Sequence, residues 1–342
     1  MGILANSART LGAAAIGGSP ATAAAQLAAR GIGPGALADG GPAASEGRGQ
    51  WQVFRENFKE HRAALVSLWV LVAMTLACIV LPMVLPWSPT DLDYDVLSAT
   101  SPSMAHPLGT DKLGRDVLSR LVSAGRVSLL IGLMVALISA TIGAGVGICA
   151  GYFGGKTDER LMWVVNVLMT VPSLPLLIAM SSVAASENSK AATVFKAVPP
   201  EWRIIIIMSL LGWMAISRVV RSQVITLRKQ EFVEAAIALG GSHSRIMVMH
   251  ILPNTVSVLA VFTTLAVSTA IMGESALSFL GLGVALPTAT WGNMLLEARD
   301  VFTAVQYWWL TWFPAGAILV TVLTVNFIGD GLRDAFDPAS KK

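Results

Sequence analysis

Long uncharged apolar stretches alternate with short polar segments from residue 63 onwards. Four stretches of at least 25 residues contain no charged residue. They cover 63–87, 127–155, 161–186 and 304–329. A fifth, 256–280, carries the single charge of Glu274. An α-helix needs about 20 apolar residues to cross a bilayer, so the pattern predicts an all-α integral membrane protein.

A further span before the fifth has the weakest signal. Only 204–217 is uncharged, which is 14 residues, and extension through Arg218 to residue 220 gives 17. This is the lower limit for a span, and an arginine near the inner end can reach the lipid headgroups. With this span, the predicted membrane domain at 63–330 contains six transmembrane helices.

The two ends of the chain are predicted to lie outside the bilayer. Residues 1–50 are rich in Ala, Gly, Ser and Pro, so we expect a disordered cytoplasmic extension. Residues 51–62 place Trp51, Phe54 and Phe58 at helical spacing between basic residues, which predicts an amphipathic interfacial helix. Residues 331–342 are expected to form a cytoplasmic tail.

Composition and charge fit a membrane protein. The 342 residues are 54% hydrophobic and 13% charged, whereas about 25% of the residues of a soluble domain are charged. Cys78 and Cys149 fall inside predicted spans, so no disulfide is expected. Nothing indicates a nucleic-acid partner. With both termini inside, 16 of the 24 basic residues lie on cytoplasmic segments, as the positive-inside rule favours.

One polar segment, 228–254, interrupts the spans with helix-forming residues. Residues 228–239 favour a helix by composition, and Gly240 suits the left-handed turn that ends one. Ser242 is placed to cap a second short helix, and Pro253 is expected to close it and begin the next span. The pattern predicts two short helices joined at a glycine.

The spacing within this segment resembles the EAA motif of ABC importer permeases. A Glu-Ala-Ala triplet is followed after three residues by a glycine, and further on by a Leu-Pro pair. His250 stands where the motif has Ile. The resemblance implies a type I importer permease fold in which 221–253 form a cytoplasmic loop, whose coupling helix docks on an ATPase subunit. The coupling candidates are Glu234, Ala235, Ala236, Gly240, Ser242, His250 and Pro253.

Three further stretches resemble the C-type permease subunit of oligopeptide, dipeptide and nickel importers. They are HPLGTDKLGRD from residue 106, ESALSFLGLG from residue 274 and GDGLRDAFDP from residue 329. The resemblance implies a multi-pass subunit of the bacterial inner membrane. It also implies a homologous second permease, two ATPase subunits or domains that bind ATP and Mg, and an extracytoplasmic solute-binding protein. The substrate stays open between peptides, nickel and another small solute.

Several residues within the spans are candidates for helix packing or for the pathway. Gly143, Gly147 and Gly151 repeat every four residues, so they share one helix face that another helix can approach closely. Asn166 is expected to donate a hydrogen bond between helices. Glu274 is a functional candidate because ionisable groups are rare within a membrane.

Proline, aspartate and histidine give further local predictions. Pro172 and Pro175 should kink the third span, and Asp111 is placed to cap a short helix outside the membrane. His106 has no second ligand at a metal-binding spacing, so we expect a surface or packing role and no metal site.

The sequence argues against catalysis by the chain itself. It contains no Gly-rich Lys-Ser/Thr nucleotide loop, so ATP and Mg are expected on partner subunits and no cofactor on this one. The competing hypothesis is an ion-coupled secondary transporter, which normally places several ionisable residues in mid-membrane. Only Glu274 qualifies here.

Overall fold

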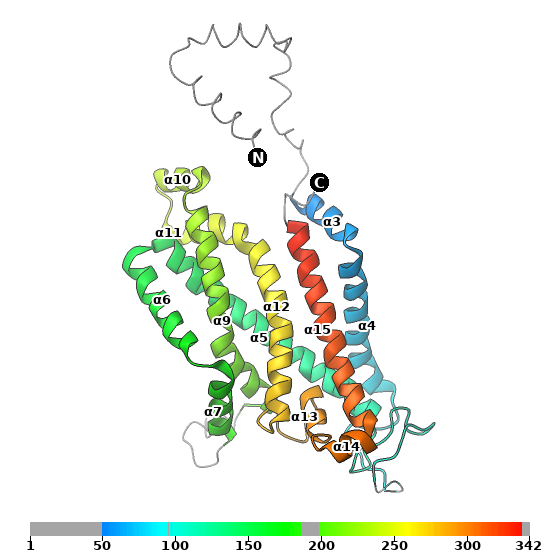
Figure 1. The fold of residues 1–342 in the computed structure, drawn as a ribbon. Coiled ribbons are helices and arrows are strands. Elements are labelled where there is room, and N and C mark those ends of the chain that lie inside the picture. The colour runs from blue at the N-terminus through cyan, green and yellow to red at the C-terminus, as the bar shows by residue number, and fades with distance from the viewer. Residues whose placement is uncertain (1–49, 95, 97, 186–197, 337–342) are drawn as a thin grey trace, which may run out of the picture. The chain divides into compact units, whose positions relative to one another are not determined.

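Helices account for all the regular structure that the described residues contain (Figure 1). This computed structural model describes residues 50–94, 96, 98–185 and 198–336. Residues 54–336 belong to one compact unit. Residues 1–49 of the predicted extension and the last residues of the predicted tail lie outside the described residues.

Five helices are long and apolar enough to cross a membrane, and a bent helix pair adds a sixth candidate. The long helices are α4 (Arg62–Val84), α5 (Val117–Phe153), α9 (Pro200–Leu227), α12 (Leu252–Phe279) and α15 (Trp308–Phe336). The bent pair is α6 (Gly155–Thr170) and α7 (Ser173–Ala185). The prediction of an all-helical membrane protein is confirmed.

The third predicted span is broken rather than merely kinked. The axes of α6 and α7 differ by 84°, and Val171 between them is extended. Pro172 explains the break, because proline forces the preceding residue out of helical geometry and has no N–H to donate. Pro175 lies within the first turns of α7 and causes no second break.

One predicted helix cap was wrong for a reason of local chemistry. Asp111 does not cap a helix; the cap is Asp116, whose carboxylate accepts from the Ser119 amide and starts the long α5 at Val117. The tail predicted at 331–342 begins as helix, because α15 continues without interruption to Phe336. There Phe336 packs against Phe54 of α3 (Gln50–Glu60), with ring centroids 4.5 Å apart.

The fourth span is longer than its uncharged core. Helix α9 covers 28 residues and includes Arg218 and Arg221. Both side chains bond to α6, through Asn166 and Asp158. Partners on a neighbouring helix lower the cost of placing charges in a spanning segment, so the helix continues past them.

Helix α5 runs through the centre of the unit and packs against α4, α9 and α12 (Figure 1). Its three spaced glycines face α9. A Cβ added at Gly147 would lie 2.6 Å from the Ser217 carbonyl oxygen, and one added at Gly143 or Gly151 would lie 2.8 Å from an α9 atom. The two backbones therefore approach to a distance that no larger residue permits.

Short helices mark the two ends of this bundle. One end carries α10 (Glu231–Ala238) and α11 (His243–Ile246), together with α3 and the end of α15 (Figure 1). The opposite end carries α7, α13 (Trp291–Leu296) and α14 (Val301–Gln306) (Figure 1).

Candidate coupling loop and outer cavity

The loop between α9 and α12 forms two short helices at an angle. Helix α10 ends at Ala238, and Gly240 follows with φ of 77°. Only glycine adopts this left-handed conformation at low cost. Helix α11 then starts after Ser242, whose backbone has the extended N-cap geometry although its side chain makes no capping bond. The loop therefore has the predicted helix–glycine–helix order.

Two details of the prediction were wrong. The first helix starts at Glu231 rather than 228, because α9 ends at Leu227 and a turn separates them. Pro253 does not end a helix, although it lies in the first turn of α12, the next span, as predicted. Residues Met247–Ile251 form a π-helical turn that joins α11 to α12. The helical chain therefore continues through Pro253 without a break, although proline has no N–H to donate. The Asn254 side-chain amide donates to the His250 carbonyl at 2.7 Å.

Two fully buried side chains attach the loop to the spans. Val233 of α10 and Ile246 of α11 pack in one cluster with Tyr152 of α5 and with Val220 and Val224 of α9. Burying an aliphatic side chain stabilises by about 1.5–3 kcal/mol. The loop is thus held to α5 as well as to its flanking helix α9.

A polar contact adds to this attachment. The Tyr152 hydroxyl and the His243 Nδ1 are 2.9 Å apart, and the Arg228 guanidinium lies 5.9 Å from the centre of the tyrosine ring. Sequence reasoning missed this group. Its only signal was a tyrosine at the last turn of a predicted span, because the partner lies 91 residues away.

The outward side of the loop is exposed and largely apolar. Glu234 and Ala235 are exposed and Ala236 half-buried, and within the described residues the Glu234 carboxylate makes no hydrogen bond or ion pair. His250 is half-buried and Pro253 exposed. Exposed apolar side chains surround them, the most open being Leu239 at 88%. The other members of this surface are Phe232, Ile237, Val248 and Met249. Apolar area exposed outside the spans is typical of a protein contact.

At the opposite end, buried charges join two distant segments. Asp111 accepts from the guanidinium groups of Arg115 and Arg120, and both arginines also donate to Glu297 after α13. Arg120 and Asp111 are 2% and 1% exposed. A buried charge is tolerated only when paired, so this cluster fixes the segment before α5 against α13.

His106 lies in the same region, buried rather than on the surface. Its Nδ1 is 2.9 Å from Asp116 and its Nε2 is 3.2 Å from Asp93. The Trp87 ring packs against it at 4.9 Å. Among the described residues, no group of three or more His, Cys, Asp or Glu side chains could hold a metal ion. The histidine therefore orients the carboxylates of Asp93 and Asp116, which lie in the segment before α5.

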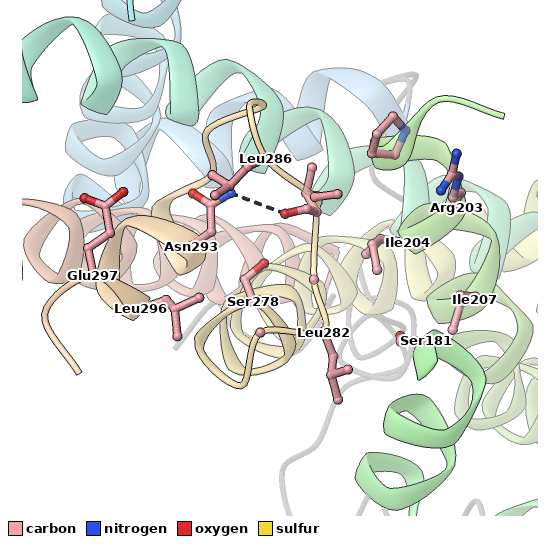
Figure 2. A pocket seen from close by; sticks show the side chains of 15 residues that line it. Ser181, Arg203, Ile204, Ile207, Ser278, Leu282, Leu286, Asn293, Leu296 and Glu297 are labelled. Atoms are coloured by element: carbon pink, nitrogen blue, oxygen red, sulfur yellow. Dashed lines mark hydrogen bonds between the residues drawn. The ribbon is translucent and has the colours of Figure 1, made fainter. Parts of the chain in front are cut away.

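Helix α12 ends beside a cavity of about 360 Å³ that α9 and α13 also line (Figure 2). Figure 2 shows Arg203 and Glu297 on opposite sides, with Ser278 between them. Both charged side chains already have hydrogen-bond partners. The Arg203 Nε donates to the Val198 carbonyl at 2.8 Å, and Glu297 accepts from two arginines. The cavity suits a ligand with polar and apolar parts.

Glu274 lies behind this cavity and is fully buried. Its Oε1 accepts from the Ser278 hydroxyl at 2.6 Å, and its Oε2 has no hydrogen-bond partner in the described structure. The carboxylate thus faces the protein rather than lipid, and it touches the cavity only through Ser278. Asn166, the other polar candidate, accepts a hydrogen bond from Arg218 at 2.5 Å, whereas a donor was predicted.

Helix α14, at the end of the bundle opposite α10, has a charged N-cap. Asp300 accepts from the hydroxyl and the amide of Thr303, and these hydrogen bonds lower the pKa of its carboxyl to about 2. The carboxylate is therefore ionised at any physiological pH.

Two family descriptions match the chain. The inner-membrane component of binding-protein-dependent transport systems matches residues 143–342, and the N-terminal transmembrane domain of oligopeptide transport permease C matches 49–102. The oligopeptide transport system permease protein OppC of Escherichia coli is 38% identical over 298 residues, or 86% of this chain and 93% of that protein. OppC of Mycobacterium tuberculosis is 39% identical over 284 residues, 83% and 93% of the two chains. The chain belongs to the OppC-type permeases of binding-protein-dependent transport systems.

As an OppC-type permease, the protein is a multi-pass component of the inner membrane and a transport subunit, not an enzyme. Permeases of this family carry no cofactor and act in a system with a binding protein and other subunits. The family resemblance that its four motifs predicted is confirmed. The match from residue 143 onwards includes the loop between α9 and α12.

Proposed function

We propose that this permease forms half of the translocation pathway of an ATP-driven peptide importer. Its partners are then a homologous second permease, two ATPase subunits or domains that hold ATP and Mg, and an extracytoplasmic binding protein. The relatives named above are oligopeptide transport permeases, which supports peptides as the substrate. Both termini are cytoplasmic in this proposal, because α3 and the end of α15 share an end of the bundle with α10 (Figure 1).

The observation that carries the proposal is the loop formed by α10 and α11. It exposes Glu234 and an apolar surface outward, while Val233, Ile246 and His243 attach it to α5 and α9. A displacement of the loop by an ATPase subunit therefore reaches the spans through packed side chains. Glu234 can bind the ATPase by a charge-assisted hydrogen bond, and the small Ala235 permits close contact.

The test is transport by the complete system in lipid vesicles. We expect uptake of a labelled short peptide that requires the binding protein and ATP, and that unlabelled peptides inhibit. Nickel and a sugar serve as non-peptide competitors and should leave peptide uptake unchanged. Uptake driven by an ion gradient without ATP would overturn the proposal. So would inhibition of peptide uptake by nickel but not by unlabelled peptides.

A further inference from the structure

Two arginines of α9 lie in the groove between α6 and α9, at the end of the bundle that carries α10. Arg221 forms a two-point pair with Asp158, through its Nε and through its Nη2 at 2.5 Å. Arg218 donates to the Asn166 side-chain oxygen at 2.5 Å. Arg218 and Arg221 are about one turn apart on α9, and their partners Asn166 and Asp158 are about two turns apart on α6.

The charges in this groove do not cancel. Asp158 neutralises Arg221, but the partner of Arg218 is a neutral amide. In the part of the chain that the structure describes, no carboxylate lies within ion-pair distance of Arg218. A positive charge within a spanning helix is costly unless something pairs with it. The groove therefore has one unit of positive charge available to an anion.

The groove is hollow and open to the surroundings. A cavity of about 390 Å³ is lined by Met162, Asn166, Arg218 and Arg221. Beside it, α6 exposes Trp163, which is 65% accessible, and the apolar Val164 and Val167. Tryptophan at the level where a span meets the headgroups is typical of a lipid-facing surface.

We propose that this groove binds the headgroup phosphate of one anionic phospholipid of the inner leaflet. The Arg218 guanidinium and the Asn166 amide nitrogen supply donors to the phosphate, and the acyl chains follow the apolar face of α6. Arginine suits this ligand because its planar fork matches phosphate oxygens. Basic pockets between spans on the cytoplasmic side bind anionic lipids by the same chemistry. The orientation proposed above serves only to name the leaflet.

The test measures lipid binding to the purified full-length permease by native mass spectrometry and thermal shift. Phosphatidylglycerol and phosphatidylcholine with identical acyl chains are the two probes. We expect phosphatidylglycerol to bind about tenfold more tightly, and Arg218→Gln to remove that preference, because a charge-assisted hydrogen bond is lost. Arg218→Lys should keep part of it, since it retains the charge without the fork.

The matched control is Lys156→Gln, which removes a positive charge from the first turn of α6 at the same end of the bundle. It should change the preference less than twofold. An equal loss in Lys156→Gln would show general attraction to a basic surface and overturn the site. Displacement of the lipid by inorganic phosphate would make free phosphate the ligand. Displacement by a peptide, but not by its C-terminal amide, would assign the groove to the pathway. Each of these two results would overturn the lipid proposal.

Discussion

Near the start of α5, Arg120 is a nearly fully buried guanidinium whose stability depends on its carboxylate partners. Asp111 and Glu297 bind it from segments that are far apart in sequence. The desolvation of such a charge is offset only while both partners stay in place. A single carboxylate in this cluster therefore affects the fold far more than a carboxylate on the surface.

We predict that Asp111→Ala destabilises the permease by roughly 3–5 kcal/mol, because it leaves buried arginine charge unpaired. The measurement is thermal unfolding in detergent together with membrane abundance. The control is Lys112→Ala, which removes the neighbouring ion pair to Asp300 on the surface. That change should cost less than about 1 kcal/mol. Equal effects of the two substitutions would contradict this account of the cluster.

Residue roles that depend on distant partners could not be predicted from the sequence. Asp111 was predicted as a helix cap because capping is a local sequence pattern, whereas its ion pair with Arg120 depends on tertiary packing. Of the two roles predicted for His106, on the surface or in packing, the packing role is correct. Its buried position between two carboxylates could not be predicted from the neighbouring sequence. Spacing in a sequence reports the chemistry of one turn and not of a folded cluster.

At the scale of helices, the contact between α5 and α9 depends on the absence of side chains. A Cβ at Gly147 would lie 2.6 Å from the Ser217 carbonyl oxygen and 2.8 Å from the Val220 Cβ. The first of these atoms belongs to the backbone of α9 and the second is bonded directly to it, so neither can move unless α9 moves. In contrast, a Cβ at Gly145 on the same helix meets nothing within 4 Å.

We therefore predict opposite results for two identical substitutions on α5. Gly147→Ala should destabilise the permease by about 1–3 kcal/mol through overpacking. Gly145→Ala should be neutral or stabilise by up to about 1 kcal/mol, because alanine favours the helix. Thermal unfolding of both variants gives the comparison. A stable Gly147→Ala variant would show that α5 and α9 are less closely packed than the structure indicates.

Helices were predictable where composition alone decides them. The apolar stretches gave the spans, and the glycine repeat identified a packing face. The break between α6 and α7 was predicted only as a kink, because a proline does not reveal its angle. The π-helical turn at Met247–Ile251 was not predictable, since it depends on how the loop joins α12 to the rest of the bundle.

At the scale of the whole molecule, the topology in the membrane is predicted from the end of the bundle that α3, α10 and the end of α15 share. Ser242 lies on the loop between α9 and α12, and Ser103 lies in the segment before α5; both are exposed. We predict that Ser103→Cys reacts with a membrane-impermeant thiol label in intact cells and Ser242→Cys does not. Cys78 and Cys149, which lie in α4 and α5, are replaced by Ser in both variants. Equally fast labelling at both positions would contradict six spans with cytoplasmic termini.

The central claim is that the α10–α11 loop transmits ATP-driven movement to the spans. Its bend needs a residue with positive φ at Gly240, where an added Cβ would meet no other atom. Substitution there thus tests the backbone angle without a steric clash. Valine is strained at this φ, whereas asparagine tolerates it.

The most direct measurement compares Gly240→Val with Gly240→Asn in the assembled transporter. Peptide uptake, ATPase co-purification and permease abundance are recorded for each variant. We predict that Gly240→Val is inserted at normal abundance but loses uptake or its ATPase subunits, while Gly240→Asn keeps most of both. Normal uptake by Gly240→Val at normal abundance would contradict the claim.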